Sequence, residues 1–228
     1  MKQGEITYRF ETPVYSGNIL YVNLIARYSC VNNCLFCSKP ETYGKENIYE
    51  QKAGANLFLS KSPSVETVIA LIDKKIQKKD TEIAFIGLGE PLMYLPKVIK
   101  IIKKIKEKYD IKTRVDTNGL VKCMYKDPVK KLVDAGLDEI RISLNAITKK
   151  EYDILCRPRF ENAFENLISF VKECANSKIY TYVSFVTGFE HEKVKKRTEE
   201  EYSKFAESLG IKKENMILRK YVKGIFKK

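Results

Sequence analysis

The sequence contains little histidine and no long apolar run. His191 is the only histidine among 228 residues, so the usual nitrogen ligand for metals is almost missing. No apolar run approaches the roughly 20 residues that span a bilayer. The polar first residues do not form the apolar core of a secretion signal. We therefore expect a cytoplasmic protein without membrane-embedded segments.

The sequence also lacks internal repeats, low-complexity tracts and any linker rich in proline, glycine and serine. Its length suits one domain, and its 44% hydrophobic content is ordinary for a globular chain. We predict a single domain over residues 1–228. Residues 1–18 form an N-terminal extension that includes a candidate extra strand near residues 5–10.

Positive charge is in excess, with 42 Lys and Arg against 29 Asp and Glu and a net charge of +13. Such an excess attracts polyanions over long distances. The lysines, however, are spread over several predicted helices, which is typical of solvated helix faces. We favour that interpretation and keep nucleic-acid binding as the alternative.

Apolar strand-like runs alternate with segments of helical periodicity. Ser62-Pro63 is predicted to open the first helix, and Thr148 and Glu151 have the spacing of a capping box. The alternation predicts an α/β fold, a partial (β/α)6 barrel of the TIM type with a parallel sheet. Reactive groups are expected at the carboxyl ends of its strands. The predicted strands are 19–25, 82–87, 111–116, 139–144, 178–186 and 216–222, and the later helices are 96–109, 127–135, 161–176 and 193–209.

Three cysteines lie together just after the first strand. Cys30, Cys34 and Cys37 have the spacing C-x3-C-x2-C. Thiolates are soft ligands that suit zinc and iron–sulfur clusters. A structural zinc site and a ferredoxin cluster both use four protein ligands, and no fourth Cys or His is nearby. Three ligands on a four-iron cluster would leave one iron open for catalysis.

The other three cysteines are isolated from this group and from one another. In a chain without a secretion signal we expect reduced thiols rather than disulfides. Their wide separation argues against a second cluster, and we predict no ligand role for them. We interpret Cys156 as a buried thiol. The three isolated cysteines are Cys123, Cys156 and Cys174.

Polar and glycine residues follow the later strands at the same edge of the predicted sheet. A glycine turn allows close approach to the backbone, and Asn-Gly alone is a common turn. An arginine after a short helix either pins a carboxylate through its planar fork or covers a helix end. These candidate positions are Gly89, Glu90, Asp116, Asn118, Ser143, Asn145 and Arg157.

The cysteine spacing in this setting resembles the signature of the radical S-adenosylmethionine (SAM) superfamily, a C-x3-C-x-aromatic-C loop. Phe36 matches the aromatic residue. Gly89 and Glu90 match two residues of the family's Gly-Gly-Glu motif, while Leu88 departs from it. Several of these segments together also resemble the small TatD-associated radical SAM proteins.

The resemblance implies a [4Fe–4S] cluster on the three cysteines, at the C-terminal mouth of the strands, and S-adenosyl-L-methionine as the second cofactor. It further implies an oxidoreductase-type reaction, in which reductive cleavage of SAM gives a 5′-deoxyadenosyl radical that abstracts hydrogen from an unknown substrate. A flavodoxin or ferredoxin would donate the electron. The implied cofactor-binding residues are Phe36, Gly89, Glu90, Asp116, Asn118, Ser143, Asn145 and Arg157.

Two other functions stay open from the sequence. One is a glycyl-radical activase or an RNA- or nucleoside-modifying radical enzyme, which the basic composition would suit. The other is a non-catalytic module that binds zinc or an iron–sulfur cluster.

Overall fold

The computed structural model describes residues 4–12, 15–37 and 56–221. Seven strands form one sheet in the order β1-β4-β5-β6-β7-β8-β9, in which only the β1–β4 pairing is antiparallel. The sheet is open, because β1 and β9 are its two edges. The predicted α/β partial barrel with six parallel strands is thereby confirmed. The strands are β1 Thr7–Tyr8, β4 Ile19–Val22, β5 Glu82–Phe85, β6 Lys112–Thr117, β7 Glu139–Ser143, β8 Tyr180–Thr187 and β9 Met216–Lys220.

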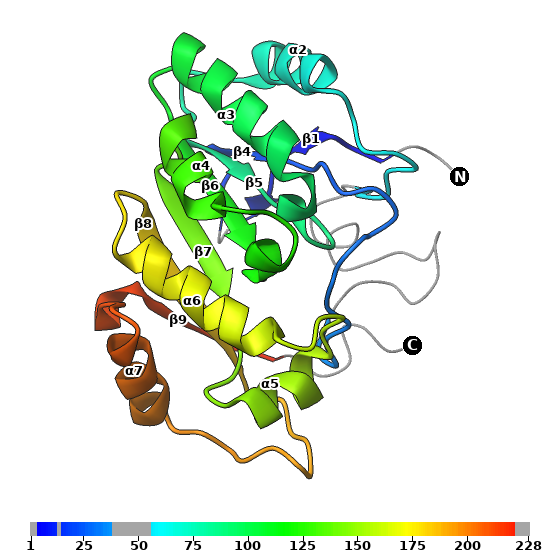
Figure 1. The fold of residues 1–228 in the computed structure, drawn as a ribbon. Helices are drawn as coiled ribbons and strands as arrows, with labels where there is room; N and C mark the ends of the chain where they lie inside the picture. The colour runs from blue at the N-terminus through cyan, green and yellow to red at the C-terminus, as the bar shows by residue number, and fades with distance from the viewer. Residues whose placement is uncertain (1–3, 13–14, 38–55, 222–228) are drawn as a thin grey trace.

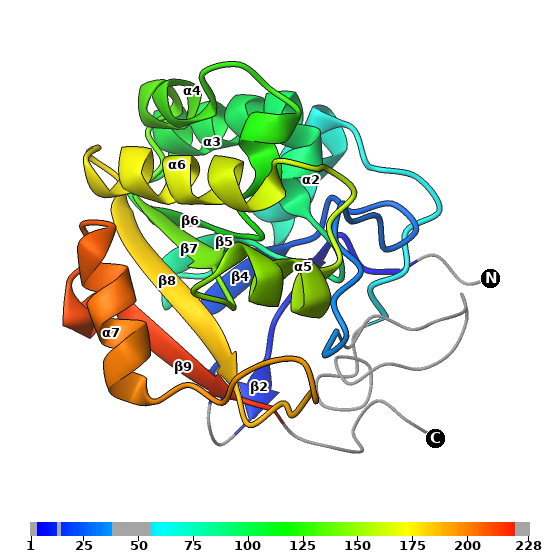
Figure 2. The same ribbon diagram turned by 60° about the horizontal axis from the view of Figure 1, so that its bottom comes forward.

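Helices cover one face of this sheet. Figures 1 and 2 show α2, α3, α4 and α6 side by side on that face, with α7 beside β8 and β9. No helix in the described ranges is long and apolar enough to cross a membrane. The helices are α2 Val65–Lys75, α3 Leu95–Lys108, α4 Pro128–Ala135, α5 Lys149–Cys156, α6 Ala163–Ala175 and α7 Glu199–Ser208. Short 3-10 turns span 91–94, 120–123 and 213–215, and a small hairpin pairs β2 Glu11–Thr12 with β3 Tyr15–Ser16.

Alternate strand residues supply the main core under these helices. Successive side chains of a strand point to opposite faces, and the residues on the helix-covered face are fully buried. The residues between them lie on the opposite face, which we call the inner face. Five core residues, one from each of β4 to β8, are Leu20, Phe85, Val115, Ile142 and Phe185.

Two helix starts differ from the prediction. The cap of α2 is Ser64 rather than Ser62, because its hydroxyl accepts a hydrogen bond from the Thr67 N–H at 3.1 Å. The last helix begins at Glu199 rather than near 193. Thr198 forms a complete capping box with Glu201 there, which fixes the start.

The predicted capping box at α5 forms only in half. Thr148 accepts from the Glu151 N–H at 3.3 Å. The Glu151 carboxylate, however, binds Arg197, which precedes α7, at 2.5 Å. A charged partner is a stronger hydrogen-bond donor than a backbone amide, so Glu151 joins α5 to α7.

Candidate functional site

The three predicted metal ligands lie in the loop after β4. Cys30 and Cys34 are partly buried, Cys37 is exposed, and all three are free thiols. A turn joins two of them, since the Cys37 N–H donates to the Cys34 carbonyl at 3.1 Å. The loop therefore follows the carboxyl end of β4, the first parallel strand of the sheet, where the barrel topology places reactive groups.

Backbone hydrogen bonds fasten this loop to the end of α5. Asn33 and Leu35 donate to the carbonyls of Cys156 and Leu155, at 3.0 and 2.9 Å. A β-bridge pairs the loop residue Asn32 with Pro158, and Arg159 donates to Val31 at 3.0 Å. The last carbonyls of a helix have no partner within it. Here they bind the cysteine loop instead.

A buried side-chain hydrogen bond reinforces the contact. The Asn32 amide donates to the Tyr152 hydroxyl at 3.1 Å, and Tyr152 is fully buried in α5. The Asn32 side-chain oxygen is buried without a hydrogen bond. Breaking this contact would leave both polar ends of a buried amide unsatisfied, which is costly. Tyr152 thus helps to position the segment between the first two cysteines.

Glu90 connects the ends of β5 and β6. Its carboxylate is 1% exposed and accepts from the Leu92 N–H at 2.8 Å, the Thr117 hydroxyl at 2.7 Å and the Asn118 N–H at 2.6 Å. Burial raises the pKa of Glu90 to about 7, although these three donors lower it in part. The Glu90 N–H also donates to Ser29 at 2.9 Å. One carboxylate therefore fixes two strand ends beside the cysteine loop.

Asn118 is the residue that brings β6 to the thiols. Its side-chain amide lies 3.5 Å from the Cys30 sulfur, and its side-chain oxygen accepts from the Leu120 N–H at 3.0 Å. Burial, followed by the nearby Glu90 charge, raises the pKa of the Cys30 thiol to about 12. Metal binding opposes that shift, because cysteine ligates as the thiolate.

Gly89 allows the backbone to approach the cysteine loop. Its φ of +133° is a conformation that other residues rarely adopt, and a Cβ there would lie 2.3 Å from the Ser29 carbonyl oxygen. A glycine is therefore required at this position. The leucine at position 88, where the sequence departs from the family motif, is buried in an aromatic cluster instead.

Ser143 and Asn145 lie at the end of β7. Asn145 has a left-handed backbone, and its amide donates weakly toward the Ser143 carbonyl at 3.4 Å and the Cys156 sulfur at 3.9 Å. Ser143 is partly buried and pairs in register with Ser184 of β8. Both residues therefore lie at the strand edge to which α5 and the cysteine loop are joined.

The remaining predicted residues are distributed around this site. Phe36 packs edge to face on Phe189, with ring centroids 5.8 Å apart. Arg157 is exposed, in a left-handed conformation at the C-cap of α5, one residue before the bridge to the cysteine loop. Asp116 is separate from the thiols. It belongs to an ion-pair network on the inner face, where Arg114 contacts it at 2.9 Å.

Sequence reasoning missed Asn32, Tyr152 and Thr117 as parts of this site. Thr117 stood in the turn that drew attention to Asn118, and its role in binding Glu90 follows only from the fold. Tyr152 carried no signal, because a tyrosine in a short helix is usually core packing. The sequence therefore identified the thiols better than the residues that position them.

The three thiols suit an iron–sulfur cluster by chemistry, since soft thiolates are its usual ligands. Within the described ranges, no three His, Cys, Asp or Glu side chains gather as they would around one metal ion. A four-iron cluster binds each cysteine on a separate iron, so its thiolates lie further apart than the ligands of one metal ion. Three thiolates suit such a cluster by their chemistry.

Comparison with known proteins agrees with this geometry. The family model of the radical SAM superfamily matches residues 25–201. An uncharacterized protein of Methanocaldococcus jannaschii is 27% identical over 157 residues, which is 68% of this chain and 34% of that protein. The chain thus spans about a third of the length of this relative.

Solved structures share the fold. TYW1 with a bound lysine–pyruvate adduct has a TM-score of 0.58 and 17% identity, covering 94% of this chain and 68% of that one. Streptococcus suis SuiB bound to S-adenosylmethionine has a TM-score of 0.60 and 18% identity, covering 92% and 44%. SuiB bound to its precursor peptide SuiA gives 0.60 and 16%, covering 90% and 41%. The likeness extends across the sheet and its helices, and the match over residues 25–201 establishes that this chain belongs to the radical SAM superfamily.

Proposed function

We propose that this chain is a radical SAM enzyme that cleaves S-adenosyl-L-methionine reductively and abstracts hydrogen from a substrate. The observation that carries the proposal is the cysteine loop held against Glu90 and Asn118 at the carboxyl ends of adjacent strands. A [4Fe–4S] cluster would be held by Cys30, Cys34 and Cys37. When bound, cluster and SAM supply one-electron cleavage to a 5′-deoxyadenosyl radical.

The protein groups would orient the cofactors and exclude water. The Glu90 carboxylate already accepts three hydrogen bonds, so its part is to hold the Gly89 backbone and Asn118 in place. Asn118 would orient Cys30, and contact between Asp116 and a cofactor stays a prediction. The remaining proposed cofactor contacts are Phe36, Gly89, Ser143, Asn145 and Arg157.

The test is anaerobic reconstitution followed by measurement of iron, sulfide and 5′-deoxyadenosine. We expect about four irons per chain, and SAM cleavage with dithionite or with a flavodoxin or ferredoxin as the electron donor. Cys34→Ala should lose the iron and the cleavage together. Cys123→Ala is the matched control, because Cys123 is also partly buried but lies outside the loop. Full iron in the Cys34 variant would overturn the ligand assignment.

A further inference from the structure

The inner face of the sheet carries a row of charges. Residues in register across β6, β7 and β8 include Asp116, Arg141 and Tyr182, and the neighbouring row pairs Arg114 with Glu139. Arg219 of β9 reaches Asp116 across the two intervening strands, with a nitrogen–oxygen distance of 4.0 Å. This reach places Arg219 on the same face and requires the sheet to curve around it.

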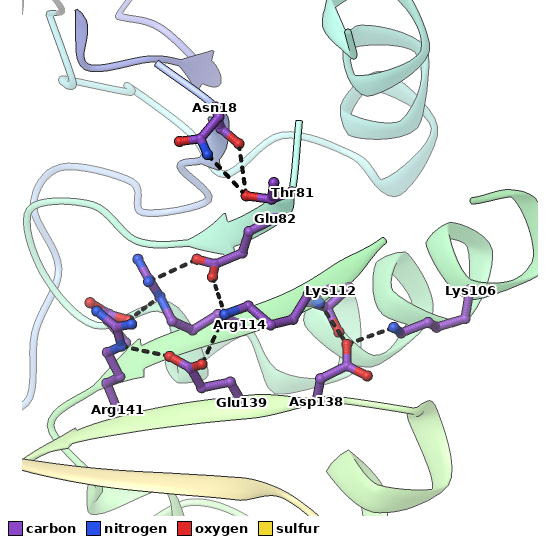
Figure 3. A network of polar contacts seen from close by, with 11 residues as sticks. Asn18, Thr81, Glu82, Lys106, Lys112, Arg114, Asp138, Glu139 and Arg141 are labelled. Carbon is purple, nitrogen blue, oxygen red and sulfur yellow. Dashed lines mark hydrogen bonds and ion pairs between the residues drawn. The ribbon is translucent and has the colours of Figure 1, made fainter. Parts of the chain in front are cut away.

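Six of the charged side chains balance one another (Figure 3). Arg114 contacts Glu82 at 2.7 Å and Asp116 at 2.9 Å. Lys112 contacts Glu82 at 2.6 Å and Glu139 at 3.0 Å, and Arg141 contacts Glu139 at 2.6 Å. Three carboxylates are thus paired with three cations, and Arg219 is the seventh charge.

Within the described part of the chain, the Arg219 side chain makes no hydrogen bond. Its only ion pair is the 4.0 Å contact to Asp116, and Arg114 is the closer partner of that carboxylate. Its side chain is 45% exposed. Positive charge is therefore in excess at this place, and the Arg219 guanidinium keeps its hydrogen-bond donors for a ligand.

The Arg141 guanidinium also has N–H donors that make no hydrogen bond among the described residues. Within the described ranges it donates only through Nε, to Glu139, and it stacks 5.4 Å from the centroid of the Tyr182 ring. Both contacts hold the side chain in one orientation before any ligand binds, which reduces the entropy cost of binding. Its side chain is 29% exposed, so a ligand can reach it.

Arg141 lies on the same strand as Ser143, which is one of the candidate cofactor-binding residues. Ser143 follows two residues later on the same face of β7, about 7 Å further toward the carboxyl ends of the strands. A ligand held at Arg141 would extend past Ser143 toward the edge where the cysteine loop lies.

We propose that Arg141 and Arg219 bind an oxyanion, carboxylate or phosphate, of the substrate on the inner face. Each of these guanidinium groups can bind either oxyanion through paired hydrogen bonds. Both lie beside Asp116, because Arg141 is in register with it and Arg219 contacts it. The anion would also offset the excess charge, which is costly to leave in a partly buried place. This inference rests on the proposed function, because it assigns the substrate class of that enzyme.

The test measures anion binding without the reaction. The melting temperature of the anaerobically reconstituted protein is followed with inorganic phosphate, with acetate and with chloride at equal ionic strength. We expect phosphate or acetate to stabilise the protein above chloride, and Arg219→Gln to weaken that binding about tenfold or more. The anion with the larger shift is the oxyanion class that this site prefers.

Further variants distinguish specific anion binding at this site from non-specific attraction to the positive net charge. Arg141→Gln should weaken binding like Arg219→Gln, and Arg219→Lys should restore part of it. Lys204→Gln removes the same charge from the exposed face of α7 and should bind like wild type. Equal stabilisation of wild type and Arg219→Gln, or none above chloride, would overturn the proposal. Because Arg219 is at the sheet edge and half exposed, this result does not depend on Arg141→Gln folding.

The two proposals fail separately. Anion binding that disappears in Arg219→Gln while no 5′-deoxyadenosine forms would count against the radical reaction alone. Normal SAM cleavage without anion binding would count against the oxyanion site alone.

Discussion

The two faces of strands β6, β7 and β8 carry opposite chemistry on the same backbone. Toward the helices, Val115, Ile142 and Phe185 are fully buried among apolar side chains. Toward the inner face, β6 and β7 present charges such as Arg114 and Glu139, which are almost as inaccessible to water, and β8 presents the neutral, buried Ser184. Burial alone therefore does not distinguish the two faces. They differ in the partners of the buried groups, which are apolar side chains on one face and opposite charges on the other.

The difference between the two faces indicates which face stabilises the fold and which face can recognise a ligand. Apolar burial stabilises the fold at about 25 cal/mol per Å². Ion pairs repay the cost of losing water only when their geometry is good, and apolar replacements are often as stable. The helix-covered face is thus explained by folding. The inner face needs another explanation. Ligand recognition is the explanation supported by Arg219, whose guanidinium makes no hydrogen bond among the described residues.

The largest expected effect comes from breaking the charge balance of the inner face. Arg114→Met leaves Glu82 and Asp116 buried without their shared cation. We expect a loss of roughly 3–5 kcal/mol in the free energy of unfolding, measured by urea denaturation. The triple variant Glu82→Leu, Arg114→Met, Asp116→Leu should recover most of it. If the triple variant is no more stable than Arg114→Met, the inner face stabilises the fold and the contrast between the faces is wrong.

The two faces also differ in how much of their structure the sequence predicts. Periodicity predicted the helix-covered face, because Ile140 and Ile142 alternate with charged residues in a short strand. The sequence does not indicate which partners the charged residues between them have. Their ion pairs join β5, β6 and β7, so the pairing depends on register, which the sequence does not show.

The candidate site divides in the same way. A local motif predicted the cysteine trio, because all of its residues lie within eight positions. The contacts that hold the loop join it to α5, more than a hundred residues away. Glu90 was predicted to contact a cofactor, but a single sequence could not indicate that Thr117 and Asn118 already donate to its carboxylate.

The next effect tests the buried side-chain hydrogen bond between Tyr152 of the helix-covered core and Asn32 of the cysteine loop. Tyr152→Phe removes the partner of the Asn32 amide while keeping the ring. We expect a loss of about 1–3 kcal/mol in the free energy of unfolding and a lower yield of reconstituted iron. Tyr180→Phe is the control, because Tyr180 is 55% exposed. Full stability and full iron in Tyr152→Phe would show that the backbone contacts alone position the loop.

A smaller effect compares one methyl group on each face. Ile140 is fully buried beneath the helices, and Ile217 of β9 is partly buried on the inner face, on which Arg219 also lies. Ile140→Val should cost about 0.5–1.5 kcal/mol, and Ile217→Val should cost less. Chemical denaturation of the two variants side by side measures the difference. A larger loss at Ile217 would mean that the inner face of β9 is as tightly packed as the core.

The smallest expected effect is a change in the acid sensitivity of the fold. Burial raises the pKa of Glu139, but the hydrogen bonds and charges of Lys112 and Arg141 lower it more, so the net pKa lies below its usual value. A lowered carboxyl pKa contributes stability above the unfolded pKa of about 4.3 that is lost as pH falls through the folded value. Glu139→Gln should therefore lose less of its free energy of unfolding between about pH 5 and pH 2 than wild type does. Urea denaturation at each pH measures both slopes. Because several carboxylates contribute to acid unfolding, the change in slope is modest, and identical slopes would mean that Glu139 gains nothing from its two cations in the folded state.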